Sequence, residues 1–304
     1  MEVLTSLFTI LVIVLLGILS RKTGVFKAEH AKTLSSFVYY FGLPALFFVK
    51  LSTLDLLKMN LQMVLGTLLP TLTLLVFLLG LKTIKLIDKD TYILLSLSIS
   101  FGSYAFFGVA FFETFQSGRW LEYSILAASL LGVLGIITTL LLLEYANKKE
   151  QSRSILRKIF TNPLILSILL GMLSSLVGFH LPFLSNALSL VGQTASATAI
   201  FVLGMFIYDR FSLQIIKEAL LYSIFRIVGL PLITYLTILV FLPGIGDLSQ
   251  FLLLENGMPA AIALVVFAER YNYKITKTTG IVSLTSILSF ISLTALFYLS
   301  QVIF

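Results

Sequence analysis

The chain contains long apolar blocks, each close to the length needed to cross a lipid bilayer. A helix rises 1.5 Å per residue, so about 20 apolar residues span the roughly 30 Å of hydrocarbon. A transmembrane β-barrel shows short segments of alternating polarity instead, and these blocks do not alternate. Only 12% of the 304 residues are charged, against about 25% in soluble domains. The sequence therefore predicts an all-α integral membrane protein.

About ten crossings are expected, with boundaries good to a few residues. They are Val3–Ser20, Thr33–Leu51, Met63–Leu81, Tyr92–Glu113, Leu121–Tyr145, Pro163–Val177, Ala187–Tyr208, Ala219–Leu242, Phe251–Ala268 and Thr278–Val302. No segment between them is long and polar enough to form a soluble domain, so one membrane domain is expected.

Positive charge indicates the orientation of these crossings. Most of the 21 Lys and Arg residues lie in the loops after the first, third, fifth, seventh and ninth crossings, and such residues accumulate in cytoplasmic loops. Both termini are therefore expected outside the cytoplasm, in a multi-pass protein of the cell membrane. The net charge of +7 then reflects topology, and no nucleic-acid partner is expected. Arg21 and Lys22 follow the first block, whereas a signal peptide has its charges in front, so we interpret this block as a retained crossing.

The two halves of the chain resemble each other. A shift of 154 residues lays Leu15–Gly24 (LLGILSRKTG) on Leu169–Gly178 (LLGMLSSLVG), with glycines and serines in register. This pattern predicts two five-helix repeats, residues 1–146 and 162–304, joined by a short basic cytoplasmic linker at 147–161. Because each half has an odd number of crossings, the second half enters from the opposite side. Inverted repeats are typical of secondary transporters, whose substrate site lies near the midplane at interrupted helices.

The ninth crossing carries a marked break. Its sequence LENGMPAAIALVVFAERYN starts with a carboxylate and an amide and then has a glycine and a proline. Proline removes a helical hydrogen bond and clashes with the preceding turn. The freed backbone groups are tolerated in a membrane only where protein or a water-filled cavity satisfies them. We therefore predict a substrate site that includes Asn256, Gly257, Met258 and Pro259.

The repeat predicts a matching break in the fourth crossing. The shift places Gly257–Pro259 on Ser103–Ala105, inside the segment SISFGSYAFFGVA, so Gly102, Ser103 and Tyr104 join the predicted site. The alternative is that these glycines only allow close helix packing. An interrupted helix presents free N–H groups and a partial positive charge at the start of its second half, which suits a carboxylate. Two crossed breaks therefore favour a small organic anion.

Several other residues have more than one interpretation. Glu255 is a candidate for proton coupling, for cation binding, for pairing with Arg226 or for a solvated helix end. Arg226 is a candidate for a substrate or structural role, or for a side chain that extends to the cytoplasmic surface. A further set is expected either to line the cavity or to serve in helix bending and packing: Pro44, Gln193, Thr194 and Ser196.

No chemistry-bearing motif of a known enzyme class is present. The chain lacks cysteine, so thiolate metal sites and cysteine nucleophiles are excluded. The signatures of zinc proteases, phosphate loops, serine hydrolases and dinucleotide binding are also missing. We expect no catalytic residue, no metal site and no cofactor.

Three segments resemble the auxin efflux carrier family, which includes the plant PIN-type carriers and many bacterial and archaeal transporters. They are Tyr39–Phe48, Thr161–Gly171 and Gly257–Asn272. The resemblance covers nearly the whole chain. It implies ten helices in two inverted repeats, with helices 4 and 9 broken and crossing, in an elevator-type fold similar to that of bile acid symporters. Where the family usually has Asn and then Pro in helix 4, this chain has Ser103 and Ala110.

The combined expectation is a secondary transporter that exports a small organic anion, such as an auxin-like acid or a dicarboxylate, by alternating access. Two alternatives stay open. One is an importer coupled to Na⁺ or H⁺ that resembles bile acid symporters, with Glu255 as the coupling residue. The other is a membrane sensor that does not transport. The expected partners are the anion and the lipid bilayer, with Na⁺ or H⁺ and a second copy of the chain as open alternatives.

Overall fold

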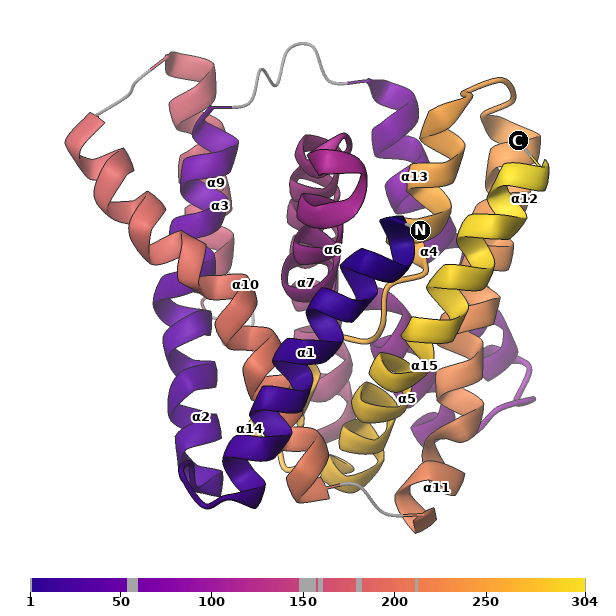
Figure 1. Cartoon of the computed structure of the whole chain (residues 1–304). Coiled ribbons are helices and arrows are strands. Elements are labelled where there is room, and N and C mark those ends of the chain that lie inside the picture. Colours follow the sequence, from indigo (N-terminus) through magenta and orange to yellow (C-terminus); the bar gives the residue numbers. More distant parts are fainter. Residues whose placement is uncertain are drawn as a thin grey trace. The chain divides into compact units, whose positions relative to one another are not determined.

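The computed structural model describes residues 2–53, 60–147, 157, 161–178, 182–210 and 213–303. The regular elements of these residues are all helices (Figure 1). Six of the described helical stretches are long and apolar enough to cross a membrane. They are Ala28–Ser52, Leu61–Thr83, Leu121–Ala146, Pro182–Asp209, Ile215–Phe241 and Ile275–Ile303. The prediction of an all-α membrane protein is confirmed.

The other four predicted crossings are also helical, in different ways. The first lies in α1 (Glu2–Lys22), and the sixth is the shorter helix α9 (Pro163–Val177). The fourth and the ninth are each interrupted. The total of ten crossings stays a prediction. The predicted linker 147–161 lies almost wholly outside the described residues.

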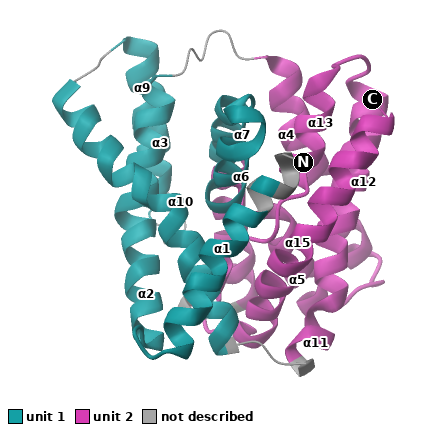
Figure 2. Cartoon of the chain, viewed as in Figure 1, with its two compact units in different colours: residues 1–59, 105–129, 151–210 teal, residues 60–104, 130–150, 211–304 magenta. Residues whose placement is uncertain are grey.

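The chain divides into two compact units, which Figure 2 shows in different colours. Unit 1 comprises residues 1–59, 105–129 and 151–210, and unit 2 comprises residues 60–104, 130–150 and 211–304. Each unit takes segments from both predicted repeats. The repeat boundaries stay a prediction.

The elements of each unit follow from these ranges. Unit 1 contains α1, α2 (Ala28–Phe37), η1 (Val38–Gly42), α3 (Leu43–Ser52), α6 (Val109–Thr114), η4 (Phe115–Gly118), α9 and α10 (Pro182–Arg210). Unit 2 contains α4 (Leu61–Thr83), α5 (Lys89–Ser100), α11 (Leu213–Ile224), η5 (Phe225–Gly229), α12 (Leu230–Phe241), α13 (Asp247–Asn256), α14 (Ala263–Arg270) and α15 (Ile275–Ile303). The elements η3 (Tyr104–Gly108) and α7 (Leu121–Asn147) contain the points where the chain passes between units.

Two prolines each follow a π-helical turn. The turn η1 precedes Pro44, and the turn η5 precedes Pro231. Proline has no N–H to donate, and its ring clashes with the carbonyl four residues earlier. A wider turn relieves that clash, and such turns often lie at functional positions. In unit 2 this turn contains Arg226, which it places inside the protein.

In unit 1, α1 and α10 pack with their backbones in close contact. A Cβ atom added to Gly17 would overlap the carbonyl oxygen of Phe201, and one added to Gly204 would overlap that of Val14. Small residues allow such approach between membrane helices. Arg21 and Asp209 join the same two helices by a hydrogen bond of 2.9 Å between Nε and Oδ1. The contact between α1 and α10 therefore depends on both glycines and on this charged hydrogen bond.

Replacing Gly17 with alanine is expected to destabilise the protein. The new methyl group meets a backbone carbonyl that cannot move without separating α1 from α10, and overpacking of this kind costs about 1–3 kcal/mol. Thermal unfolding of the purified protein in detergent measures the effect. Gly132→Ala is the matched control, because a Cβ at Gly132 meets nothing within 4 Å. Equal unfolding temperatures for the two variants would contradict the close packing.

Candidate functional site

Two broken helices meet in unit 2. The helix α5 ends at Ser100, and the helical path resumes at Tyr104. The helix α13 ends at Asn256, and α14 starts at Ala263. We call residues 101–104 and 257–262 the crossover. The predicted breaks are therefore present: Gly102, Ser103 and Gly257–Pro259 lie outside regular helix, whereas Asn256 is the last residue of α13 and Tyr104 is the first residue of η3.

The two segments of the crossover run antiparallel and form backbone hydrogen bonds with each other. Gly102 and Ala260 form an isolated β-bridge. The amide of Ser103 donates to the carbonyl of Pro259 at 2.7 Å, and the amide of Ala261 donates to the carbonyl of Phe101 at 2.9 Å. These bonds pair part of the backbone that the two helix breaks release, which lowers the cost of such breaks in a membrane protein.

Arg226 contacts the crossover and is fully buried. Its Nε and Nη2 donate to the carbonyl of Met258 at 3.0 and 2.8 Å, and its Nη1 donates to the carbonyl of Ile99 at 2.6 Å. Nη2 also donates to the Tyr104 hydroxyl at 3.0 Å. The guanidinium thus caps carbonyls from both interrupted helices, because its planar fork presents five donors. Its side chain does not extend to a surface.

Gly102 is a position where a side chain has no room. A Cβ atom there would overlap Nη2 of Arg226 and the ring of Tyr104. The guanidinium carbon of Arg226 lies 5.2 Å from the centre of that ring, within the range of a cation–π contact. The glycine therefore allows the arginine and the tyrosine to reach the crossing.

The start of α14 leaves backbone donors available. Leu264 and Val265 donate to carbonyls in the preceding turn, and Ala260 donates to the Thr285 hydroxyl at 3.1 Å. The amides of Ile262 and Ala263 donate to no acceptor in the part of the chain that the structure describes. Free amides and a partial positive charge are characteristic of a helix N-terminus. Both residues are buried, so these donors are shielded from bulk water.

Two polar residues end α13 immediately before the break. Asn256 is fully buried, and its Nδ2 donates to the carbonyl of Leu252 at 3.1 Å. Its Oδ1 accepts no hydrogen bond from the described residues. Glu255 is also fully buried and is therefore not a solvated helix end. Among the described residues, no group of three or more acidic or histidine side chains gathers where it could hold a metal ion.

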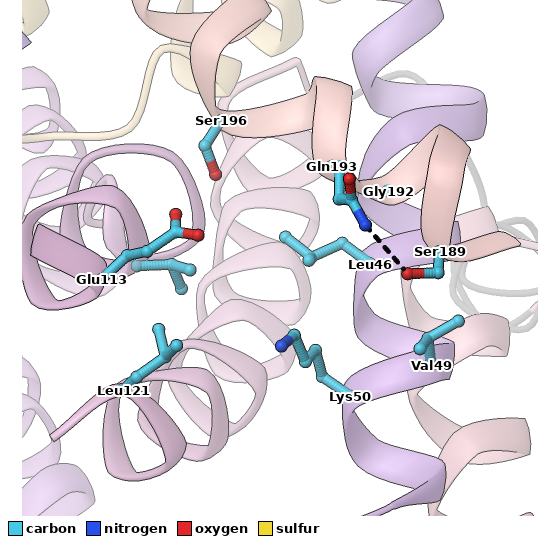
Figure 3. Close-up of a pocket in the computed structure, with 10 residues that line it drawn as sticks. Leu46, Val49, Lys50, Glu113, Leu121, Ser189, Gly192, Gln193 and Ser196 are labelled. Carbon is cyan, nitrogen blue, oxygen red and sulfur yellow. Dashed lines mark hydrogen bonds between the residues drawn. The ribbon is translucent and has the colours of Figure 1, made fainter. Parts of the chain in front are cut away.

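The other predicted lining residues lie in unit 1. Pro44 belongs to α3, half-buried, and is not on the wall of the pocket described next. Thr194 is exposed on α10 and donates to the carbonyl of Val191. Gln193 and Ser196, also on α10, line a pocket of about 410 Å³ (Figure 3). Their function stays a prediction.

Two charged residues of this pocket, Lys50 and Glu113, were not predicted from the sequence. Each is a charge within a turn of the end of an apolar stretch, a pattern that also fits ordinary helix ends. Thr285 of α15 was not predicted either, and its hydroxyl accepts a hydrogen bond from the amide of Ala260 in the crossover. Serine and threonine are common packing residues in membrane helices, so the sequence offered no signal for that role.

A polar cluster holds the ends of the broken helices in unit 2. Asp90 of α5 pairs with Lys274 at 2.7 Å and accepts from the Tyr273 hydroxyl at 3.0 Å. The hydrogen bond from Lys274 lowers the pKa of Asp90 below its usual value, and that from Tyr273 acts in the same direction. The Tyr271 hydroxyl donates to Glu144 of α7 at 3.0 Å. The chain after α14 is thus anchored to both α5 and α7.

Comparison with known proteins indicates a transporter. A family model described as membrane transport protein matches residues 2–298. The chain is also 26% identical over 295 residues to a protein described as "Uncharacterized transporter MJ1031", from Methanocaldococcus jannaschii. That alignment covers 92% of this chain and 93% of the archaeal protein.

Proposed function

Because the chain belongs to the membrane transport protein family, we propose that it is a secondary transporter that carries a small organic anion across the cell membrane. Membership confirms the transporter family expected from the sequence. The proposed substrate is a carboxylate, such as an auxin-like acid or a dicarboxylate, and the proposed direction is export. The proposed substrate site is the crossover, with contributions from Gly102, Ser103, Tyr104 and the segment Asn256–Pro259.

The observation that carries this proposal is the pair of buried amides at the start of α14. Ile262 and Ala263 present two adjacent N–H groups, and a carboxylate has two oxygens to accept them. Anions bind at helix N-termini because the amides point outward and the helix dipole favours negative charge. The crossover segment that leads into this helix is held by the buried guanidinium of Arg226, which adds positive charge in a region of low dielectric constant.

Asn256 supports the recognition of a polar substrate. Its Oδ1 is a buried acceptor without a partner among the described residues, and leaving such a group unpaired costs about 1–3 kcal/mol. A hydroxyl or protonated carboxyl group of a substrate would satisfy it. The segment 257–259 then prevents α13 from continuing into α14, so that the amides at the start of α14 can bind the substrate.

The proposed transport cycle is alternating access, in which the site opens to one side of the membrane at a time. The family resemblance supports ten crossings in two inverted repeats and an elevator-like movement of a transport domain against a scaffold. The distribution of Lys and Arg over the loops supports termini outside the cytoplasm. Each unit takes segments from both predicted repeats, which is compatible with one unit acting as the scaffold and the other as the transport domain.

Glu255 favours a second candidate, a carrier coupled to H⁺ or Na⁺. Its carboxylate is fully buried in the predicted ninth crossing, and ionisable residues inside a membrane often take part in proton or ion pathways. In this version the anion moves together with a cation that Glu255 binds. Transport that ignores both the proton and the sodium gradient would exclude it.

Substrate-dependent flux tests the proposed site. Proteoliposomes containing the protein are screened with radiolabelled carboxylates, and Asn256→Ala and Pro259→Ala are compared with the parent protein. We expect at least about a tenfold loss of flux in each variant, which corresponds to about 1.4 kcal/mol of lost transition-state or binding free energy. Gln250→Ala is the matched control, since this amide lies on the same helix and bonds to Ser300. Full flux in both crossover variants would refute the site.

A further inference from the structure

The pocket in unit 1 has walls from four parts of the chain. Leu46, Val49 and Lys50 come from α3, and Val109 and Glu113 come from α6. The start of α7 contributes Leu121, and α10 contributes Ser189, Gly192, Gln193 and Ser196. Its volume of about 410 Å³ lies within the range of small-molecule sites. All of these residues belong to unit 1, whereas the crossover belongs to unit 2.

Two opposite charges face this space without pairing. Lys50 and Glu113 stand on different walls, with the ammonium and the carboxylate both directed into the pocket (Figure 3). Neither forms an ion pair or a side-chain hydrogen bond with any other residue that the structure describes. Both are exposed, so the two charges are accessible to a ligand. Their separation exceeds the reach of a direct salt bridge, which leaves room for a molecule between them.

The remaining surface combines polar and apolar groups. Gln193 donates from Nε2 to the Ser189 hydroxyl at 3.2 Å, which fixes the amide and leaves its Oε1 as an acceptor. The Ser196 hydroxyl also points into the pocket (Figure 3). The aliphatic side chains of Leu46, Val49, Val109 and Leu121 supply the apolar part. Five of the ten lining residues have polar or charged side chains, so the pocket suits a ligand that has several polar groups as well as an apolar part.

We propose that this pocket binds a small zwitterion of the amino-acid class, with its carboxylate on Lys50, its ammonium on Glu113 and its aliphatic part on the apolar wall. A molecule with both charges pairs each of the two side chains, and charged hydrogen bonds are the stronger ones. A molecule with one charge leaves the other side chain unpaired. The site goes beyond the proposed anion transport, because it uses none of the residues of the crossover.

Binding of three related probes to the purified full-length protein tests this proposal. The probes are L-leucine, N-acetyl-L-leucine, which lacks the ammonium, and L-leucinamide, which lacks the carboxylate. Isothermal titration calorimetry in detergent measures each dissociation constant. We expect leucine to bind at least about tenfold more tightly than either analogue, because each analogue loses one charged contact, and tenfold corresponds to about 1.4 kcal/mol.

Variants assign each charge to its partner. Glu113→Gln should remove the preference for leucine over N-acetyl-leucine, and Lys50→Gln should remove the preference for leucine over leucinamide. Glu122→Gln and Lys22→Gln are matched controls, since both residues are exposed in unit 1 but do not line the pocket. Absence of leucine binding, analogues that bind as well as leucine, or preferences that survive both pocket substitutions would each overturn the proposal.

The same test separates this site from the crossover. Asn256→Ala should bind leucine with unchanged affinity even where its anion flux is lost, and Glu113→Gln should keep any anion flux that the parent protein shows. Failure of the anion proposal therefore leaves the zwitterion proposal intact, and the reverse also holds. Loss of leucine binding in Asn256→Ala would overturn the independence of the pocket.

A phospholipid headgroup with an ammonium and a phosphate has the same chemistry as a free amino acid. Repeating the titration in nanodiscs made with phosphatidylethanolamine or with phosphatidylglycerol distinguishes the two sources. Weaker leucine binding in phosphatidylethanolamine alone would show that the headgroup occupies the pocket, and equal binding would assign it to the free zwitterion. In both cases Lys50→Gln and Glu113→Gln must weaken the interaction.

Discussion

Replacing Arg226 with glutamine is expected to cause the largest loss of stability of any single substitution considered for this protein. The change removes four hydrogen bonds, to the carbonyls of Met258 and Ile99 and to the Tyr104 hydroxyl. Each buried polar group left without its partner costs about 1–3 kcal/mol, so a total loss of about 3 kcal/mol or more is expected. Thermal unfolding in detergent, monitored by circular dichroism, measures it.

The control for this prediction is Arg119→Gln. Arg119 is exposed and lies over the Trp120 ring at 5.6 Å, so its loss should change stability by less than about 1 kcal/mol. Arg226→Lys should fall between the two glutamine variants, because lysine keeps the charge but lacks the planar fork that reaches two carbonyls at once. An Arg226→Gln protein that unfolds at the parent temperature would show that the guanidinium does not hold the crossover.

Replacing Gly102 with alanine is expected to abolish substrate-dependent transport. The methyl group would overlap Nη2 of Arg226 and the Tyr104 ring, and neither neighbour has free space to move into, since both are buried. The bridge to Ala260 must then shift, and a displacement of about 1 Å in a functional site can cost about a hundredfold in rate. Flux in proteoliposomes measures the loss, at matched protein incorporation.

Gly80→Ala provides the comparison for Gly102→Ala. A Cβ at Gly80, within α4 of the same unit, meets nothing within 4 Å. Alanine also favours the helix over glycine by about 1 kcal/mol. This variant should therefore transport normally and be at least as stable as the parent. Normal transport by Gly102→Ala would show that the crossover tolerates a side chain and that its geometry does not limit transport.

The two helix breaks of the crossover differ in how directly they could be predicted from the sequence. Pro259 cannot continue a helix, so the interruption after Asn256 follows from local backbone chemistry. The other break has no proline, and the internal repeat was needed to locate it at Gly102–Ala105. The structure shows what holds this second break open. Phe101, Gly102 and Ser103 all pair with the backbone of residues 259–261. The interruption that Pro259 causes in one helix therefore also stabilises the interruption in the other.

The environment of Arg226 could not be predicted from the sequence. A basic residue in an apolar stretch has several plausible environments, and the sequence left open a side chain that extends to the cytoplasmic surface. Its partners Ile99 and Met258 are 127 and 32 residues away in the chain. No local sequence pattern predicts contacts between residues so far apart in the chain. The π-helical turn before Pro231, which carries Arg226, became visible only with the fold.

The sequence by itself determined that this is an all-α membrane protein with a break near Pro259, because the length of an apolar block and the effect of proline on a helix are properties of short segments. Its family followed from similarity over residues 2–298. Tertiary structure alone decided that Arg226 and Thr285 hold the crossover and that Lys50 and Glu113 line one pocket. Lys50 and Glu113 are 63 positions apart in the sequence, and they face one space because α3, α6 and α10 pack around it. Charge and hydrogen bonding act through space, so their partners are set by how distant segments pack.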